Sequence, residues 1–453
     1  MHSRAHIAGA LATSFVAGHL TVDELVERGA EVLGRRWRWL PAMARSVADS
    51  FLYRRPHPRQ QAMMNFILAD PTFLNAFAKH RLRVAKISTG RSSMRPPAVA
   101  EPWPVRAIDT VGELAKWLEV SLNELDWFAA VRRVESGRTK LSHYRYRLLA
   151  KRFGRVRLIE SPKPRLKKIQ RSILTEILDH IPPHEAAHGF RRGRSIKTFA
   201  APHVGRNVVI KIDLQDFFPS IAVARVQALF RTAGYHESVA DVLAALCTTT
   251  APDEVWVRQA GAAEFCGGSP GGTAVGGVLR RIYSRPHLPQ GAPTSPSIAN
   301  LAAYRLDCRL AGLASSAGAQ YTRYADDLVF SGNVVFGRSA RRFQLHACAI
   351  ALQEGFQVHH RKTRIMRQGN RQSVAGIVVN SHINTRRDDF DRLKATLTNC
   401  IRFGAETQNR TKHDNFRSHL DGRISFVEMI NADKGRRLRR LFDQIEWANR
   451  DSV

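Results

Sequence analysis

The chain has 453 residues, with 70 Lys and Arg against 39 Asp and Glu, so its formal net charge is +31. Apolar residues make up 44% of the sequence, which is enough for hydrophobic cores and excludes a disordered basic tail. A foldable chain this basic indicates a polyanionic partner, because each phosphate that a basic side chain neutralises releases counterions. Nucleic acid is the first candidate and an anionic membrane surface is the second. Length alone predicts about three domains.

No run of about 18 apolar residues occurs, so we expect no membrane-spanning helix. The mildly apolar stretch Ile7–Gly18 has its apolar residues at helical spacing, and no convincing cleavage site follows it. We therefore interpret it as a helix and not as a signal peptide. The cysteines are odd in number and include no CxxC, which predicts a cytoplasmic chain without disulfides or a zinc site. They are Cys247, Cys266, Cys308, Cys348 and Cys400.

Residues 1–87 are predicted to be helical, with Thr21 as the N-cap of one helix. They contain thirteen basic and six acidic residues, a net charge of +7. Their recurring aromatic residues are interpreted as a small core, with an aromatic platform for nucleic acid as the alternative. Residues 88–105 contain four prolines and are predicted to be a linker.

Asp109-Thr110 is predicted to start a second helical segment. From residue 144 to residue 162 the apolar residues alternate with polar ones around Gly154, which predicts a β-hairpin. Residues 207–212 (NVVIKI) contain a short run rich in β-branched residues, which is typical of a buried strand.

Residues 386–453 are predicted to be helical and have a net charge of +4, which leaves +20 on residues 88–385. Most of the charge excess therefore lies in the middle of the chain. The Gly-rich stretch 261–277 lacks the GK[ST] of a P-loop. We interpret that stretch as a flexible insertion, with a phosphate-binding loop as the alternative.

Three carboxylates stand out in this middle segment. Asp213 directly follows the buried strand, and Asp326-Asp327 lies between two strand-like stretches, 321–324 and 328–330, so we expect a hairpin with both aspartates at its tip. Carboxylates at the ends of adjacent strands can share two Mg²⁺ ions about 4 Å apart, which activate a hydroxyl and stabilise a leaving pyrophosphate. Taken singly, Asp326-Asp327 could be a solvated turn and Asp213 a helix N-cap.

The segments around these carboxylates resemble bacterial retron-type reverse transcriptases in order and spacing. The three segments that carry the resemblance are VVIKIDLQDFFPSI (208–221), LPQGAPTSPSIAN (288–300) and YTRYADDLVFS (321–331). Four others also match in order: RLIESPKPRLKKIQRSIL (157–174), AAHGFRRGRSI (186–196), HHRKTRIM (359–366) and VAGIVVN (374–380). The resemblance covers residues 106–445 and leaves residues 1–87 outside it.

The resemblance implies an α+β right-hand polymerase. It has fingers, a palm with an antiparallel catalytic sheet and a helical thumb, and here an extra α-helical N-terminal domain precedes them. The expected boundaries are 1–87 for the helical extension, 88–105 for the linker, 106–205 for the N-terminal helix and fingers, 206–385 for the palm and 386–453 for the thumb.

By resemblance, Asp213, Asp326 and Asp327 form the family's metal-binding and catalytic triad. The implied cofactor is a pair of Mg²⁺ ions, with Mn²⁺ as an alternative. Lys362 matches the lysine proposed to protonate the leaving pyrophosphate, a role that suits a general acid. Phosphate binding explains Lys362 equally well.

The resemblance also assigns residues to the incoming deoxynucleotide. The backbone from Leu214 to Phe217 is expected near the triphosphate, and Phe218 matches the steric gate that excludes a ribose 2′-OH. Two basic residues are placed to bind the triphosphate, with a solvated basic surface as their alternative, and a Gln-Gly pair packs under the nascent base pair. These four residues are Arg157, Lys167, Gln290 and Gly291.

Two departures from the retron pattern concern RNA recognition. The family's NAxxH is here Phe199-Ala200-Ala201-Pro202-His203, and its VTG is Val374-Ala375-Gly376, so an Asn and a hydroxyl are replaced. The residues that the resemblance assigns to RNA are His203, Val374, Gly376, Arg436, Arg437, Arg439 and Arg440.

The resemblance implies an RNA-directed DNA polymerase that uses deoxynucleotides and a structured non-coding RNA as template and primer. A retron enzyme of this kind primes from a 2′-OH and makes branched multicopy single-stranded DNA. Such a product usually serves an effector protein in anti-phage defence in the cytoplasm, without a membrane partner. The alternatives are another defence-associated or group II intron-like reverse transcriptase and a non-catalytic RNA-binding scaffold. Residues 1–87 are expected to help hold RNA or an effector.

Overall fold

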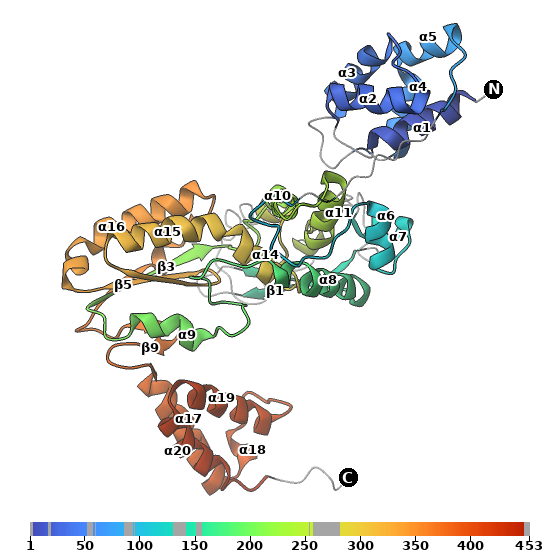
Figure 1. Cartoon of the computed structure of the whole chain (residues 1–453). Coiled ribbons are helices and arrows are strands. Elements are labelled where there is room, and N and C mark those ends of the chain that lie inside the picture. The colour runs from blue at the N-terminus through green and yellow to red at the C-terminus, as the bar shows by residue number, and fades with distance from the viewer. Residues whose placement is uncertain are drawn as a thin grey trace, which may run out of the picture. The chain divides into compact units, whose positions relative to one another are not determined.

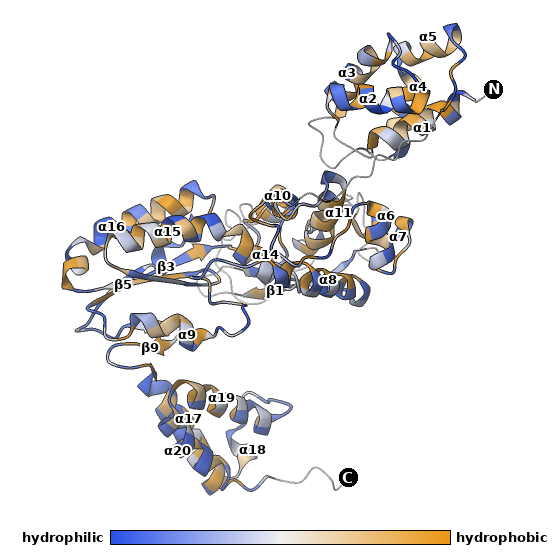
Figure 2. Cartoon of the chain, viewed as in Figure 1, coloured by the Kyte–Doolittle hydropathy of each residue, from blue (hydrophilic) through white to orange (hydrophobic). Residues whose placement is uncertain are grey.

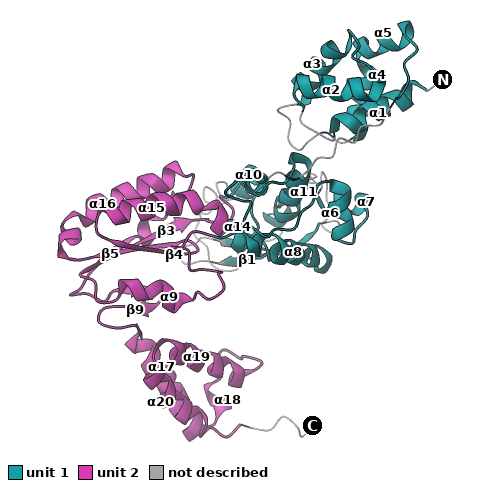
Figure 3. Ribbon diagram, viewed as in Figure 1, with its two compact units in different colours: residues 1–182, 221–298 teal, residues 183–220, 299–453 magenta. Residues whose placement is uncertain are grey.

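A computed structural model describes most of the chain (Figure 1). The described residues are 3–16, 20–51, 58, 60–85, 94, 96–129, 142–150, 156–252, 254–256 and 281–447. The chain divides into two compact units (Figure 3), residues 1–182 with 221–298 and residues 183–220 with 299–453. The Gly-rich stretch 261–277 and Cys266 lie outside the described residues, and the other four cysteines are free thiols. None of the helices in the described ranges is both long and apolar enough to cross a membrane.

Five helices occupy the start of the first unit and enclose a core of their own. Thr21 is the N-cap of the second helix, although its side chain makes no capping hydrogen bond. In the first helix, Ile7, Leu11 and Phe15 are fully buried, as their helical spacing predicts. Figure 2 shows apolar and polar residues on every one of these helices. They are α1 (Arg4–Val16), α2 (Val22–Leu33), α3 (Leu40–Phe51), α4 (Gln60–Ala69) and α5 (Pro71–Lys79).

The rest of the first unit combines one β-hairpin with short helices. The predicted hairpin is present, with β1 and β2 antiparallel and Tyr144 opposite Pro162. Thr110 caps α6 as predicted, because its hydroxyl accepts the N–H of Glu113 at 3.1 Å. The elements are α6 (Val111–Trp117), α7 (Leu122–Ala129), β1 (Tyr144–Ala150), β2 (Val156–Pro162), α8 (Pro164–Glu176), η3 (Leu178–His180), α10 (Val223–Thr232), α11 (Glu237–Cys247) and α14 (Ser295–Ala302), which runs into the second unit.

The second unit is built on a five-stranded antiparallel sheet. Its strand order is β4-β5-β3-β6, and β7 also pairs with β3. The central strand β3 is largely buried, as expected of a β-branched run covered on both faces. The strands are β3 (Val208–Gln215), β4 (Gln320–Tyr324), β5 (Asp327–Gly332), β6 (Gln357–Val358) and β7 (Arg364–Arg367).

Helices cover both faces of this sheet (Figure 1). The helices α15 (Tyr304–Ser316) and α16 (Val334–Gln353) lie on one face. On the other face α9 (Ile196–Ala200) and η4 (Ala201–His203) pack with a small sheet, β10-β9-β8. The core on this second face joins Phe199 to Val209, Val329 and Val374.

The C-terminal helices enclose a separate core, and α17 and α20 carry many hydrophilic residues (Figure 2). The remaining elements are η5 (His360–Lys362), β8 (Ser373–Val374), β9 (Ile377–Val378), β10 (Asn384–Thr385), α17 (Arg387–Phe403), α18 (Ala405–Gln408), α19 (Phe416–Ile430) and α20 (Ala432–Phe442).

The hairpin between β8 and β9 turns on two residues with positive φ. Ala375 has φ +46° and Gly376 has φ +86°, which is the pairing of a type I′ turn. A β-branched residue is disfavoured at positive φ, so the alanine at 375 suits this turn better than the threonine of the retron pattern.

We expect Gly376→Ala to lower the free energy of unfolding by about 1–2 kcal/mol, because a Cβ is unfavourable at φ +86°. No atom lies within 4 Å of that Cβ, so crowding adds nothing. The matched change Ala375→Gly should shift the free energy of unfolding by less than about 0.5 kcal/mol. Glycine removes the steric strain of a Cβ at φ +46°, and this gain offsets the larger conformational entropy that glycine loses on folding. Urea unfolding followed by circular dichroism measures both; equal effects of the two changes would contradict the turn assignment.

Candidate active site

Three carboxylates lie at one end of the five-stranded sheet. Asp213 is opposite Asp327 in the register of β3 and β5, and Asp326 occupies the turn between β4 and β5. The predicted hairpin with both aspartates at its tip is therefore confirmed. The prediction that the buried strand ends at Ile212 is wrong, because β3 continues to Gln215 and contains Asp213.

The turn that carries Asp326 is held by backbone contacts. Ala325 has φ +54°, a conformation that costs an L-residue about 1–2 kcal/mol. The Leu214 N–H donates to the Asp326 carbonyl at 2.9 Å, and the Arg323 guanidinium donates to the Ala325 carbonyl at 3.3 Å. These two contacts fix the strained turn against β3 from one side and against the interior from the other.

Two ammonium groups balance the carboxylates. Lys362 Nζ lies 3.0 and 3.2 Å from the two carboxylate oxygens of Asp213. Lys211 Nζ lies 2.8 and 2.9 Å from the oxygens of Asp327. Lys362 reaches the site on η5, which follows a hydrogen bond from the His359 N–H to the Asp213 carbonyl at 2.7 Å. The site thus brings Lys362 to the three aspartates, as the sequence predicts.

Burial and mutual repulsion raise the pKa of Asp326 to about 6, because the charges of Asp327 and Asp213 face its partly desolvated carboxyl. Burial also raises the pKa of Asp327, although Lys211 offsets part of that shift. Crowded carboxylates of this kind favour a bound cation, and hard divalent ions prefer oxygen ligands.

The arrangement of the carboxylates is not that of a preformed metal site. Within the ranges the structure describes, no three His, Cys, Asp or Glu side chains converge as the ligands of one ion. Lys362 and Lys211 instead occupy the oxygens of Asp213 and Asp327. The donor set of three carboxylates fits a divalent cation, which would compete with the two lysines for these oxygens.

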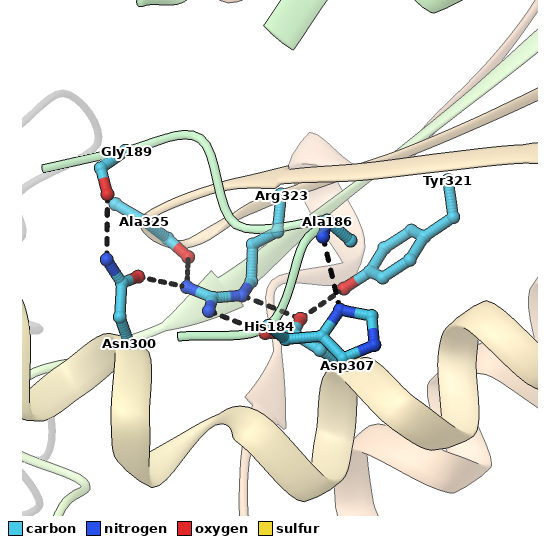
Figure 4. A network of polar contacts seen from close by, with 8 residues as sticks. All are labelled: His184, Ala186, Gly189, Asn300, Asp307, Tyr321, Arg323 and Ala325. Atoms are coloured by element: carbon cyan, nitrogen blue, oxygen red, sulfur yellow. Dashed lines mark hydrogen bonds and ion pairs between the residues drawn. The ribbon is translucent and has the colours of Figure 1, made fainter. Parts of the chain in front are cut away.

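A buried polar network lies behind the turn (Figure 4). The guanidinium of Arg323 is fully buried and donates to both carboxylate oxygens of Asp307, at 2.6 and 2.8 Å. The Tyr321 hydroxyl donates to the same carboxylate at 2.7 Å, and Arg323 also donates to the side-chain oxygen of Asn300 at 2.9 Å. Burial lowers the pKa of Arg323, but the charge and hydrogen bonds of Asp307 outweigh it and raise that pKa.

The backbone of Arg323 is fixed as firmly as its side chain. Its N–H donates to the Ala186 carbonyl at 2.7 Å, and its carbonyl accepts the N–H of His188 at 2.8 Å. Gly189, the next residue, lies so close to the turn that a Cβ on it would be 2.9 Å from the Ala325 nitrogen. The Asn300 side chain donates to the Gly189 carbonyl at 2.7 Å. The segment 186–189 is therefore packed directly against the turn.

Aromatic rings border the carboxylates. The ring of Phe218, the predicted steric gate, lies 6.2 Å from that of Phe190 between centroids. Phe190 is 51% exposed and also lies 6.1 Å from Tyr324, which directly precedes the turn. The side chains of Phe217 and Leu214 are buried, so these two residues can present only their backbone to a ligand.

The other residues predicted to bind nucleotide belong to the first unit. The Glu160 N–H donates to the Gln290 carbonyl at 2.9 Å. Gly291 has φ +134° and sits so close to β2 that a Cβ would be 3.0 Å from the Glu160 carbonyl. Arg157 lies on β2 with its Nε buried and without a hydrogen-bond partner among the described residues. Lys167 is exposed on α8.

Behind this contact Glu160 and His287 form a buried pair. The two side chains are at most 1% exposed, and His287 Nε2 lies 3.0 Å from Glu160 Oε2. The pair joins β2 to the segment that leads into Gln290-Gly291. The first unit therefore holds Arg157, Gln290 and Gly291 together around β2.

Comparison with known proteins places the chain in a family. A model of the reverse transcriptases, described as RNA-dependent DNA polymerases, matches residues 149–388. The retron Mx65 reverse transcriptase of Myxococcus xanthus is 40% identical over 332 residues, which cover 73% of this chain and 70% of that relative. The chain belongs to the retron reverse transcriptases, a family of RNA-dependent DNA polymerases.

Two further proteins are similar over much of the chain. The retron Mx162 reverse transcriptase of Myxococcus xanthus is 38% identical over 344 residues, which are 73% of this chain but only 65% of that relative. A solved structure of the foamy viral protease-reverse transcriptase in complex with double-stranded DNA matches with a TM-score of 0.32 and 13% identity. It covers 68% of this chain and 44% of that one, and so slight a likeness carries no argument about the fold.

Three of the residues assigned to RNA in this reverse transcriptase are not exposed contacts. His203 is fully buried between Ser331 and Thr322, with its ring nitrogens 2.7 Å from each hydroxyl. Burial lowers its pKa to about 3. Val374 is also fully buried. Their assignment as direct RNA contacts is therefore wrong, because both side chains belong to the core beneath α9. Arg439 is likewise engaged, since it forms ion pairs with Asp421 and Glu428.

The exposed basic residues of α20 remain candidates for RNA binding. Arg436, Arg437 and Arg440 are exposed, and Arg436 pairs with Asp433. A cavity of about 520 Å³ lies beside α20. It is lined by five basic side chains and one acidic side chain together with uncharged residues: Arg371, Val378, Asn384, Thr385, Arg387, Phe390, Asp391, Lys394, Lys434 and Arg437.

Sequence reasoning missed Lys211, Arg323 and Phe190. A lysine inside an otherwise apolar strand, in alternation with Asp213, is a signal that could have found Lys211. Arg323 stands two residues before Ala325 in a strand with a buried face, where an arginine needs a carboxylate partner. No signal in the sequence shows that Phe190, 28 residues before Phe218, lies against that ring.

We expect Asp307→Asn and Arg323→Met each to lower the free energy of unfolding of this reverse transcriptase by about 3–5 kcal/mol, since each leaves a buried polar group without its charged partner. The double variant Asp307→Asn/Arg323→Met should lose less than the sum of the two single losses. Arg387→Met is the control, because its pair with Asp391 is exposed on both sides and should contribute at most about 1 kcal/mol. Urea unfolding gives all four values, and strict additivity would contradict the buried pair.

Proposed function

We propose that this chain is a retron reverse transcriptase that copies a structured non-coding RNA into DNA. Residues 106–205 act as fingers, 206–385 as the palm and 386–453 as the thumb, after a helical extension (1–87) and a linker (88–105). The observation that carries the proposal is that Asp213, Asp326 and Asp327 lie close to one another at one end of the sheet, beside Lys362.

Asp213, Asp326 and Asp327 hold the divalent metal in this proposal. Two Mg²⁺ ions, or Mn²⁺, would lower the pKa of an attacking hydroxyl and offset charge on the leaving pyrophosphate. The crowding that raises the pKa of Asp326 supports a cation at this point. The Arg323 network positions the turn that carries two of the three ligands.

Lys362 changes its partner in the proposed cycle, whereas Lys211 stays with Asp327. Both ammonium groups neutralise the carboxylates while no cation is bound. Lys362 has a 53% exposed side chain, so it is free to swing toward the leaving pyrophosphate and donate a proton or balance its charge. Lys211 is less exposed, at 24%, and stays to orient Asp327.

Phe218 excludes ribonucleotides in this proposal, because its partly exposed ring lies beside Phe190, which itself lies beside Tyr324 at the start of the turn. The buried side chains of Leu214 and Phe217 leave their backbone to face the triphosphate. Arg157 and Lys167 bind its phosphates, and Gln290-Gly291 supports the new base pair. The close packing of Gly291 on Glu160 supports a fixed backbone at that position.

The RNA partner is bound by α20 and the cavity beside it, through Arg436, Arg437 and Arg440. Five basic side chains around that cavity suit RNA phosphates. The product is branched multicopy single-stranded DNA primed from a 2′-OH, and it serves an effector protein in anti-phage defence. Similarity to retron reverse transcriptases over 73% of the chain supports this narrower assignment.

The other functions have less support. The Phe199 and Ala375 departures favoured a different reverse transcriptase, yet Phe199 is fully buried and Ala375 occupies a turn. The change at Phe199 lies in the core and removes no exposed contact, whereas the change at Ala375 removes a hydroxyl from a partly exposed turn. A non-catalytic scaffold would not need three crowded carboxylates, whose repulsion is unfavourable unless a cation is bound.

Primer extension on poly(rA)/oligo(dT) with Mg²⁺ tests the catalytic proposal. We expect the wild type to make DNA and Asp326→Asn to lose activity by about 10³-fold or more, since a metal ligand is removed. Asp443→Asn, an exposed change on the same unit, is the control and should keep full activity. RNA binding should persist in Asp326→Asn; a wild type that makes no DNA would exclude the enzyme.

Nucleic acid that copurifies with the protein tests the retron assignment. We expect a short RNA joined to single-stranded DNA through a branch that resists RNase, because the primer is an internal 2′-OH. Denaturing gels before and after RNase and debranching enzyme resolve the two strands. Asp326→Asn should copurify with the RNA alone. Recovery of only unbranched nucleic acid from the wild type would point to another class of reverse transcriptase.

A further inference from the structure

A basic and aromatic surface lies on the N-terminal helices, outside the residues that the family model matches. It is formed by two segments, the loop between α2 and α3 and the residues that end and follow α5. We call it the N-terminal basic surface and define it by Arg35, Arg36, Trp37, Arg38, Lys79, His80, Arg81 and Arg83.

Three contacts bring the two segments side by side. The Ala85 N–H donates to the Val32 carbonyl at 2.8 Å. A Cβ on Gly34 would lie 2.9 Å from the Ala85 Cβ. The rings of Trp37 and His80 are 4.9 Å apart between centroids. Residues that are about 45 positions apart in sequence therefore present one surface.

The charge of this surface is concentrated and unbalanced. Its six Lys and Arg residues are nearly half of the thirteen in residues 1–87. All six side chains are exposed. By contrast Arg28, on α2, is paired with Glu24. Six close cations without carboxylate partners in the described structure repel one another, so an anionic ligand would be favourable there.

The aromatic residues add a stacking element. The Arg35 guanidinium lies 3.6 Å above the Trp37 ring, and His80 borders the same ring. A stacked guanidinium keeps its N–H groups at the rim, where phosphate oxygens can accept them. Arginine planes and aromatic rings are also the surfaces on which unpaired bases stack.

We propose that the N-terminal basic surface binds the phosphodiester backbone of nucleic acid, as a second contact apart from the polymerase site. The template RNA and the DNA product share this chemistry. A protein or membrane partner fits less well, because none of the described residues before Val99 is an exposed large apolar side chain. Docking and membrane surfaces usually need such residues.

The test compares two double variants of the full chain that each lose two exposed positive charges. Arg36→Ser/Arg81→Ser removes one arginine from each segment of the surface. Arg4→Ser/Arg45→Ser is the matched control, with exposed arginines on α1 and α3 outside both segments. Both double variants should have the thermal unfolding midpoint of the wild type, which checks that neither pair of substitutions disturbs the fold.

Binding is measured without deoxynucleotides to single strands of about 30 nucleotides, as RNA and as DNA of the same sequence, across a range of salt. Each lost phosphate contact should lower the slope of log K against log salt by about 0.7, so the surface variant should lose about 1.4 and the control much less. A smaller slope on RNA alone would identify the template RNA as the ligand. A smaller slope on both RNA and DNA would show that the surface binds either backbone. An unchanged slope relative to the control would overturn the proposal.

Ultraviolet crosslinking locates the contact independently of affinity. Peptides that contain Trp37 or His80 should carry a crosslinked nucleotide in the wild type and in the control, and lose most of it in Arg36→Ser/Arg81→Ser. DNA synthesis on poly(rA)/oligo(dT) measures the polymerase activity separately. A failure of the proposed polymerase function can therefore be told apart from a failure of the proposed contact at the N-terminal basic surface. Crosslinks confined to the second unit would contradict a contact at this surface.

Discussion

The buried ion pair between Arg323 and Asp307 is the constraint on which the rest of the active site depends. Neither side chain has any exposure, and a desolvated charge is tolerated only while its partner stays within hydrogen-bonding distance. The pair therefore fixes β4 against α15, and the third donor of Arg323 fixes Ala325. Asp326 and Asp327 directly follow Ala325 in the chain. The buried Arg323–Asp307 pair, which is less accessible to solvent than these two aspartates, therefore sets the position of both carboxylates.

The carboxylates themselves are held in an arrangement that opposes their own stability. Three acidic groups share one end of a sheet, and two lysines compensate them in part. The strained backbone of Ala325 and the raised pKa of Asp326 are both costs that the surrounding structure bears. A protein selected only for stability would not keep such a cluster, and the excess negative potential is what a cation or a transferred phosphoryl group requires.

Local patterns gave the β-hairpins, the buried central strand and the three aspartates, because alternation and β-branched runs are properties of short segments. The same patterns placed the end of β3 too early, and the resemblance assigned His203 and Val374 to RNA although both side chains are buried. Burial of a polar residue depends on partners distant in sequence; Ser331 is 128 residues from His203. Phe190 was missed for the same reason, since only the fold places it beside Phe218. Lys211 and Arg323 were missed although each is a charged residue in a strand with a buried face.

The order of the chain through the two units has a consequence for synthesis on the ribosome. The first unit contains residues 1–182 and 221–298, so it cannot close until residue 298 has been made. At about 5–20 residues per second, the 116 residues from 183 to 298 take roughly 6–23 seconds. During that interval Glu160 and Gln170 lack the partners that later bury them, Gln290 and Leu246. The part of the first unit that follows its N-terminal helices therefore stays incomplete during that interval.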